Sequence, residues 1–239
     1  MLGLGHGIHT DTPGTGEVFH NNYSILFDGV NDYIDIDTAA GSIDTDKGTF
    51  SAWIKFSASS SNNDSFVRAS ADSNNQIGMF YLTDTEVFRF LYKAGGTGKY
   101  VDISTDAETT QNWTHLAMTW DTDADELKAY VNGSQVASTV GSLGSWSGTI
   151  DTVVAGKNST ADNTYFVGYI DEISAFDEVV DIPTLYNEGS PKDVEFSGLA
   201  GLIGYWRFTE GTGTSVADEA TASNTATLVN GAAWSIVTP

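Results

Sequence analysis

Acidic side chains are the residues of this chain most suited to binding an ion or a polar ligand, and one short stretch concentrates them. The sequence LFDGVNDYIDI, residues 26–36, places Asp28, Asp32 and Asp35 close to Asn31. Asp, Asn and Gly are also the residues that tight turns select. The stretch therefore indicates two strands around a turn, with either ordinary turn chemistry or a metal site or ligand-binding edge.

Residues that could carry catalysis are few. His115 lies within an apolar alternating run, and we interpret it as a packed or hydrogen-bonded residue rather than a base. Asp171 and Glu172 are neighbours in a predicted strand. Because successive strand side chains alternate between faces, we expect these two carboxylates to point apart and not to act as a pair. The segment GGTGK, residues 95–99, lacks the length and the following helix of a phosphate-binding loop, so we predict a turn.

The composition bounds the fold and its partners. The chain has 239 residues, no cysteine, 40% apolar residues and 12% aromatic residues, which favours one large all-β domain without disulfides. A formal charge of −22, from 32 acidic and 10 basic residues, would be repelled by nucleic acids and by membrane surfaces. The first residues do not form a basic segment followed by an apolar one, so we predict no signal peptide. The sequence has no long apolar run, so we also predict no membrane-spanning segment.

Short alternating runs separated by turn signals dominate the pattern from Tyr23 onward, and they predict a β-sandwich. The run 49–56 puts Phe50, Ala52, Ile54 and Phe56 on one face. Asn132-Gly133 predicts a hairpin turn. Residues 181–188 predict a single short helix with Asp181 as its N-cap.

Domain boundaries follow from these patterns. Residues 1–22 are rich in Gly and Thr and predict an extended arm, in which His6 and His9 have no Cys or further His nearby that would favour a metal site. Residues 23–239 predict the sandwich. We expect residues 193–239 to supply strands that complete the same sandwich.

Four stretches in the order SILFDGVNDYIDI, GTFSAWIKF, NWTHLAMTWDTDADELKAYVNGSQVAS and GYIDEISAFDEVV resemble the laminin G-like domains of the concanavalin A-like lectin/glucanase superfamily. The resemblance spans roughly residues 23–180. It implies a jelly-roll sandwich of two curved antiparallel sheets. The Gly-rich start and the tail, residues 185–234, resemble proteins of tailed-bacteriophage particles.

The resemblance also implies a cofactor and bears on catalysis. Many relatives hold a structural calcium ion with carboxylates from the early FDG region and the late IDE strand, which correspond to Asp28 and Asp171 here, with Asp32 as a further candidate. Turn and strand-end roles for the same acids remain the alternative. The Glu-x-Asp-x-x-Glu strand of the glucanases is absent from the sequence, so we expect no enzyme activity.

Sugar binding would need exposed aromatic side chains beside polar groups. Trp146, in a Gly/Ser-rich segment, and Tyr165 are the candidate ligand-binding residues. We interpret Trp53, Trp120 and Trp206 as core residues because they lie within strand patterns.

These features lead to two functional hypotheses. The first is a non-enzymatic structural protein of a bacteriophage particle, present in many copies or as a homo-oligomer, whose arm contacts other virion proteins and whose sandwich contacts host glycans. The alternative is a bacterial carbohydrate-binding module or adhesin. The first hypothesis places the protein in the extracellular virion.

Overall fold

A computed structural model describes residues 20–57, 63–105, 111–158, 164–191, 198–220 and 224–239. Most of the predicted arm, with His6 and His9, lies outside these residues. The described chain forms two eight-stranded antiparallel sheets, which confirms the predicted all-β sandwich. None of the described helices is long and apolar enough to cross a membrane.

Sheet A contains eight strands, seven of them in one continuous order. The order is β10 (Ser134–Val140), β9 (Glu126–Val131), β8 (Thr114–Asp121), β3 (Lys47–Phe56), β12 (Val167–Phe176), β1 (Ser24–Asp28) and β16 (Ala233–Ser235), and β13 (Leu202–Trp206) also pairs with β12.

Sheet B faces it. Its order is β14 (Ser215–Val216), β15 (Ala226–Val229), β2 (Tyr33–Asp35), β11 (Thr152–Ala155), β4 (Asp64–Asp72), β5 (Asn75–Leu82), β6 (Val87–Ala94) and β7 (Thr97–Ser104).

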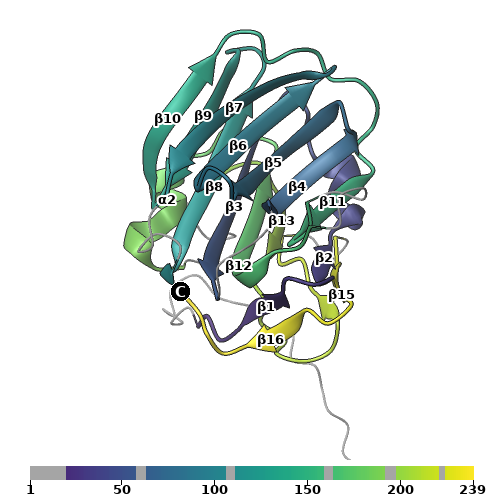
Figure 1. Cartoon of the computed structure of the whole chain (residues 1–239), viewed down its shortest axis with the longest axis vertical. Coiled ribbons are helices and arrows are strands. Elements are labelled where there is room, and N and C mark those ends of the chain that lie inside the picture. Colours follow the sequence, from purple (N-terminus) through teal and green to yellow (C-terminus); the bar gives the residue numbers. More distant parts are fainter. Residues whose placement is uncertain (1–19, 58–62, 106–110, 159–163, 192–197, 221–223) are drawn as a thin grey trace, which may run out of the picture.

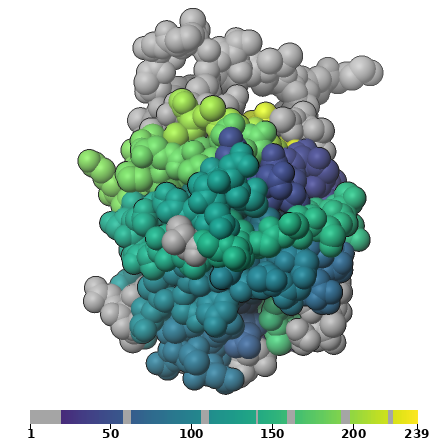
Figure 2. Space-filling view, turned by 90° about the horizontal axis from the view of Figure 1, so that it is seen from above, coloured from purple at the N-terminus to yellow at the C-terminus, as the bar shows by residue number. Residues whose placement is uncertain are grey.

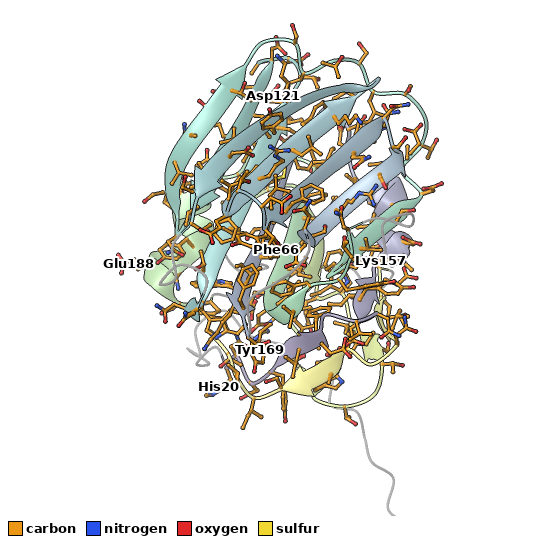
Figure 3. The ribbon with its side chains drawn as sticks, viewed as in Figure 1. His20, Phe66, Asp121, Lys157, Tyr169 and Glu188 are labelled. Atoms are coloured by element: carbon orange, nitrogen blue, oxygen red, sulfur yellow. The ribbon has the colours of Figure 1, made fainter. Side chains whose placement is uncertain are left out.

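The core lies between the sheets and follows the alternation of the sequence. All four residues predicted for one face of β3 belong to it, as does Trp120 of β8. Phe66 lies near its centre (Figure 3), where its ring packs edge-on against Phe166 at 5.3 Å. Several further aromatic rings meet there at similar angles, an arrangement that adds about 0.5–1.5 kcal/mol for each pair beyond the buried area.

The stretch at residues 26–36 is not a hairpin. Its two strands β1 and β2 join different sheets, and the turn between them carries the chain from one sheet to the other. Strands of a hairpin and strands in two different sheets show the same alternation of apolar and polar residues. The sequence pattern therefore does not distinguish a hairpin from a crossing between sheets.

The C-terminal strands lie at the edges of both sheets, beside the N-terminal strands. In Figure 1 the yellow strands β16 and β15 lie next to the purple strands β1 and β2. Trp206, Phe208 and Leu228 from this segment are buried in the common core. The described residues 202–220 and 224–235 therefore pack as part of the sandwich.

A third layer covers the outer face of sheet A. It includes α2 (Ile182–Tyr186), which begins at Asp181, whose carboxylate accepts a hydrogen bond from the Thr184 N–H at 3.1 Å, as the sequence predicts. It continues into the 3-10 turn η2 (Asn187–Gly189); a second such turn, η1 (Asp37–Ser42), follows β2. Seen from above, the green residues of this layer lie on the opposite side of the molecule from the blue strands β5 and β6 (Figure 2).

Candidate functional site

The predicted calcium ligands are divided between two places. Asp28 and Asp32 lie together in the turn after β1, where the Asp28 N–H donates to the Asp32 carboxylate at 3.0 Å. The Asp28 carboxylate accepts a hydrogen bond from the Val30 N–H at 2.8 Å. Both acids thus make the turn contacts that the alternative interpretation predicts.

Asp171 lies elsewhere on the sandwich. In the β1–β12 ladder Asp28 is opposite Val167, four residues before Asp171, which corresponds to a separation of about 13 Å along the strand. The three acids therefore do not surround one ion in this structure. Within the turn, burial raises the pKa of Asp32, and its Oδ1 atom has no hydrogen-bond partner among the described residues. A calcium ion held there by Asp28 and Asp32 stays a prediction.

The expectation that Asp171 and Glu172 point to opposite faces is wrong. Between the pairs Asp171–Trp53 and Ser174–Ser51, β12 has two residues where β3 has one. Glu172, one of these two, adopts a left-handed φ of 51°. This β-bulge interrupts the alternation and turns both side chains to the outer face of sheet A. There the Asn21 amide donates to Asp171 at 2.8 Å, and the Tyr205 hydroxyl donates to Glu172.

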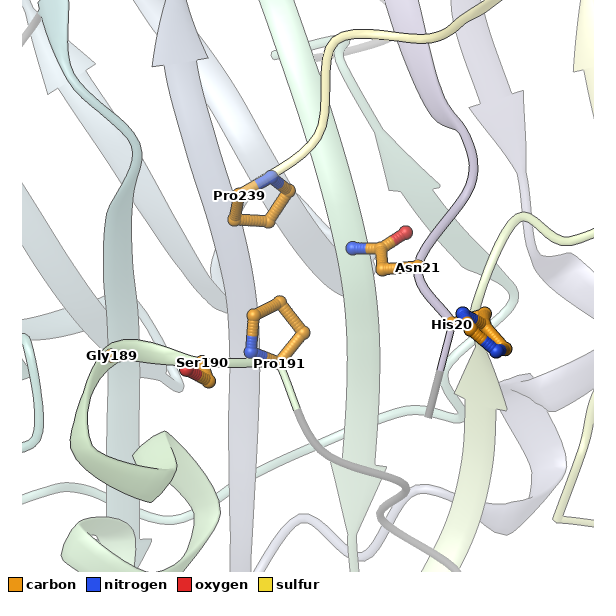
Figure 4. A pocket seen from close by; sticks show the side chains of 6 residues that line it. All are labelled: His20, Asn21, Gly189, Ser190, Pro191 and Pro239. Carbon is orange, nitrogen blue, oxygen red and sulfur yellow. The ribbon is translucent and has the colours of Figure 1, made fainter. Parts of the chain in front are cut away.

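The two carboxylates are nevertheless buried. Burial and the neighbouring Glu172 raise the pKa of Asp171 well above its ordinary value. An open depression of about 410 Å³ lies nearby, lined by His20, Asn21, Gly189, Ser190, Pro191 and Pro239. Figure 4 shows these six residues on the two sides of one strand, and His20 is the one among them with an aromatic ring. Asp171 and Glu172 do not line this depression, and their exposed fractions are only 0% and 5%.

Trp146 and Tyr165, the two predicted ligand-binding residues, lie at opposite ends of sheet B. Trp146 is partly buried and packs against Tyr92 at 6.1 Å, near the turn between β4 and β5. Tyr165 is partly exposed and lies in the short hairpin after β11, where it pairs with Lys157. The structure therefore does not bring the two together.

Tyr165 instead joins two residues that the sequence did not single out. The ammonium of Lys157 lies 4.5 Å from the ring centre of Tyr33 and 5.9 Å from that of Tyr165. We call Tyr33, Lys157 and Tyr165 the tyrosine–lysine cluster. All three side chains are partly exposed, and Lys157 has no carboxylate within salt-bridge distance among the described residues. Figure 3 labels Lys157 at the edge of the sandwich near β2 and β11.

The backbone on either side of Lys157 is closely packed. Gly156 has a φ of 80°, and a Cβ atom there would lie 2.5 Å from the Phe27 ring, so only glycine fits. The Asn158 carbonyl accepts a hydrogen bond from Arg68 at 2.6 Å. Burial, together with nearby Asp35 and Tyr165, raises the pKa of Tyr33, so its hydroxyl stays protonated at neutral pH.

The cluster thus offers two aromatic rings, two hydroxyl groups and a cation on one surface. Aromatic faces pack against apolar C–H groups, while the hydroxyls and the ammonium donate to oxygen atoms. Asp35, two residues after Tyr33 on the same face, adds a partly exposed acceptor. These protein groups are complementary to the C–H groups and hydroxyl oxygens that a sugar ring presents.

Solved structures share this architecture. A proposed carbohydrate-binding protein from Bacteroides ovatus is 18% identical with a TM-score of 0.67, over 92% of this chain and 61% of that protein. A pentraxin from Limulus polyphemus is 16% identical with a TM-score of 0.55, over 71% of this chain and 84% of that one. The family 40 carbohydrate-binding module of a Ruminococcus gnavus sialidase, bound to α2,6-sialyllactose, is 13% identical with a TM-score of 0.55, over 70% and 96%.

These likenesses concern the fold, and the chain spans about three fifths of the Bacteroides protein. No curated protein sequence matches the chain. A family model described as the concanavalin A-like lectin/glucanases superfamily matches residues 28–181, more than half of the sequence. Together with the two packed antiparallel sheets, this match shows that the chain belongs to that superfamily.

Proposed function

We propose that this chain is a non-enzymatic carbohydrate-binding module or adhesin domain of a bacterium, and that the tyrosine–lysine cluster contacts the glycan. The observation that carries the proposal is the convergence of Tyr33, Lys157 and Tyr165 at one end of sheet B. The fold is shared with a carbohydrate-binding module that was solved with sialyllactose, which supports a glycan as the ligand class. The absence of the Glu-x-Asp-x-x-Glu strand supports a binding role over hydrolysis.

Binding of an immobilised glycan panel tests the proposal. The panel contains lactose, α2,3- and α2,6-sialyllactose and laminari-oligosaccharides, and the sugar that binds best is then titrated by calorimetry. We expect Tyr33→Ala and Tyr165→Ala each to weaken binding about tenfold, because each removes one stacking surface. Lys157→Gln keeps the length of the stem but removes the charge, and it should also weaken binding.

Tyr169→Ala is the matched control, since Tyr169 is a partly exposed tyrosine on sheet A. It should bind as the wild type does, and thermal unfolding verifies that every variant is folded. Failure of the wild-type protein to bind any sugar of the panel would contradict the proposed function. Undiminished binding by the cluster variants would place the glycan elsewhere.

Assembly into a bacteriophage particle stays a prediction. It would be supported by copurification of the protein with intact particles. A protein found only outside such particles would leave the bacterial module as the better description.

A further inference from the structure

A second tyrosine–cation arrangement lies on the same outer face of sheet B, at the far edge from the tyrosine–lysine cluster. Tyr100, on the edge strand β7, is 51% exposed and is the most exposed phenylalanine, tyrosine or tryptophan among the described residues. The guanidinium of Arg89 lies 4.0 Å from the centre of its ring. We call Tyr100, Arg89 and Asp102 the tyrosine–arginine cluster.

This cluster is fixed before any ligand arrives. Arg89 and Asp102 face each other across β6 and β7, and two hydrogen bonds of 2.7 Å join the guanidinium to the carboxylate. The carboxylate of Asp102 raises the pKa of Arg89, which remains a cation. An exposed aromatic ring that is already held in place loses little conformational entropy when it binds.

The groups around Tyr100 match a sugar ring. Its ring supplies a packing surface for C–H groups, and the planar guanidinium and carboxylate supply a donor and an acceptor for hydroxyl groups. Leu91, directly opposite Tyr100, is partly exposed. Gly98, two residues before Tyr100 on the same strand, has no side chain that could block one edge of the tyrosine ring. An isolated surface tyrosine is common, but Tyr100 is also held by a cation that is itself fixed by a bidentate ion pair.

The two clusters are separate sites on one face. A cross-strand row runs from Asp35 through Val154, Arg68, Gly78 and Leu91 to Tyr100. Five strand spacings along this row correspond to about 24 Å. Its middle is covered, since Arg68 is only 5% exposed and donates to the hairpin after β11. One short sugar therefore cannot contact both clusters.

We infer that the tyrosine–arginine cluster is a second glycan-binding site, so that one domain binds a glycan-coated surface at two points. The inference rests on the proposed function of the tyrosine–lysine cluster. Because both clusters lie on the outer side of one rigid sheet, the second contact with a densely coated surface is made by the same domain and adds avidity.

Calorimetry with the best-binding sugar of the panel tests the inference through its stoichiometry. The wild-type protein should bind two sugars per chain, and Tyr100→Ala should bind one. Arg89→Lys keeps the charge but loses the two-pronged hydrogen bond, and it should weaken only the second site. On a surface densely coated with the same sugar, Tyr100→Ala should dissociate at least tenfold faster, while the affinity of its remaining site for the free sugar is unchanged.

The outcomes separate the two ideas. A wild-type stoichiometry of one, with Tyr100→Ala indistinguishable from the wild type, overturns the second site and leaves the proposed function intact. If neither Tyr33→Ala nor Tyr165→Ala reduces binding but Tyr100→Ala abolishes it, the first site is wrong and the second is retained. No binding by the wild type overturns both.

Discussion

At the scale of single residues, burial decides the protonation of His115. The side chain is 1% exposed, packs against Trp53 and Tyr186, and shares a hydrogen bond of 2.7 Å with the Ser51 hydroxyl. Burial lowers the pKa of His115 to about 3, so the ring is neutral near pH 7. A serine beside a histidine could be taken for a nucleophile and its base, but the enclosure by α2 keeps a substrate away. The interpretation of His115 as a packed residue is confirmed.

The depressed pKa of His115 predicts a pH dependence of stability. The unfolded chain takes up a proton at His115 as the pH falls below about 6.5, and the folded chain does not until about 3. The stabilisation is therefore complete above pH 6.5 and is lost as the pH falls toward 3. His115 should lower the free energy of unfolding by about 2 kcal/mol at pH 5 relative to pH 7.

Urea unfolding of the wild type and of His115→Gln at both pH values measures this. The difference between the two proteins isolates His115 from the carboxylates, which titrate in the same range. Parallel pH profiles for the two proteins would contradict the prediction.

At the scale of strands and turns, the alternation of the sequence predicts most of the core but fails where the ladder is irregular. It places Phe50, Ala52, Ile54 and Phe56 inward correctly because a regular strand has a period of two. It misplaces Glu172, because one extra residue in a bulge reverses every later assignment of faces. The left-handed φ of a glutamate at this position has no sequence signal.

The candidate site shows the same limit. Tyr165 could be recognised because it follows a polar, loop-like segment. Tyr33 and Lys157 were not recognised, because their partnership depends on β11 lying beside β2, which are more than a hundred residues apart in the chain. The Gly/Ser-rich flank of Trp146 does not reveal how exposed the side chain is, and in the structure its ring packs on Tyr92. Pairing between distant strands is not encoded in local pattern.

The hairpin after β11 gives an element-scale prediction. Gly156→Ala should destabilise the fold, because the new Cβ atom would lie 2.5 Å from the Phe27 ring in addition to the left-handed φ of 80°. Gly141→Ala is a matched control: its φ is 91°, but nothing lies within 4 Å of the added atom. We expect Gly156→Ala to lose about 1–3 kcal/mol more than Gly141→Ala in urea unfolding, and to weaken glycan binding because Lys157 is adjacent.

At the scale of the whole molecule, charge is the dominant property. With 32 acidic and 10 basic residues, the folded chain repels itself, although ion pairs such as Lys47–Glu178, Arg89–Asp102 and Lys128–Glu126 offset some of this repulsion. The cations of both proposed glycan contacts are therefore uncommon groups on an acidic surface. Self-repulsion is weakened by salt, since the Debye length shortens from about 10 Å at 0.1 M to about 3 Å at 1 M.

A comparison of NaCl with CaCl₂ distinguishes general screening of the negative charge from specific binding of calcium. The melting temperature should rise with NaCl through screening. If Asp28 and Asp32 hold calcium, CaCl₂ at equal ionic strength should raise it further, and EDTA should reverse that increment. Asp32→Asn should abolish the calcium-specific increment while keeping the response to NaCl. Identical curves in NaCl and CaCl₂ would contradict the calcium prediction.

The pairing of the first strands with the last has a consequence for how the chain is made. Ser24 lies opposite Ser235, and Ile34 lies opposite Leu228. During synthesis β1 and β2 emerge before the other strands described for the sandwich, but these neighbours are added only when residues 226–235 leave the ribosome. Contacts this distant in sequence slow folding and leave strand edges unprotected in the meantime. The sandwich can thus close only after residues 226–235 have been synthesised, and until then the unpaired edges of β1 and β2 are open to aggregation.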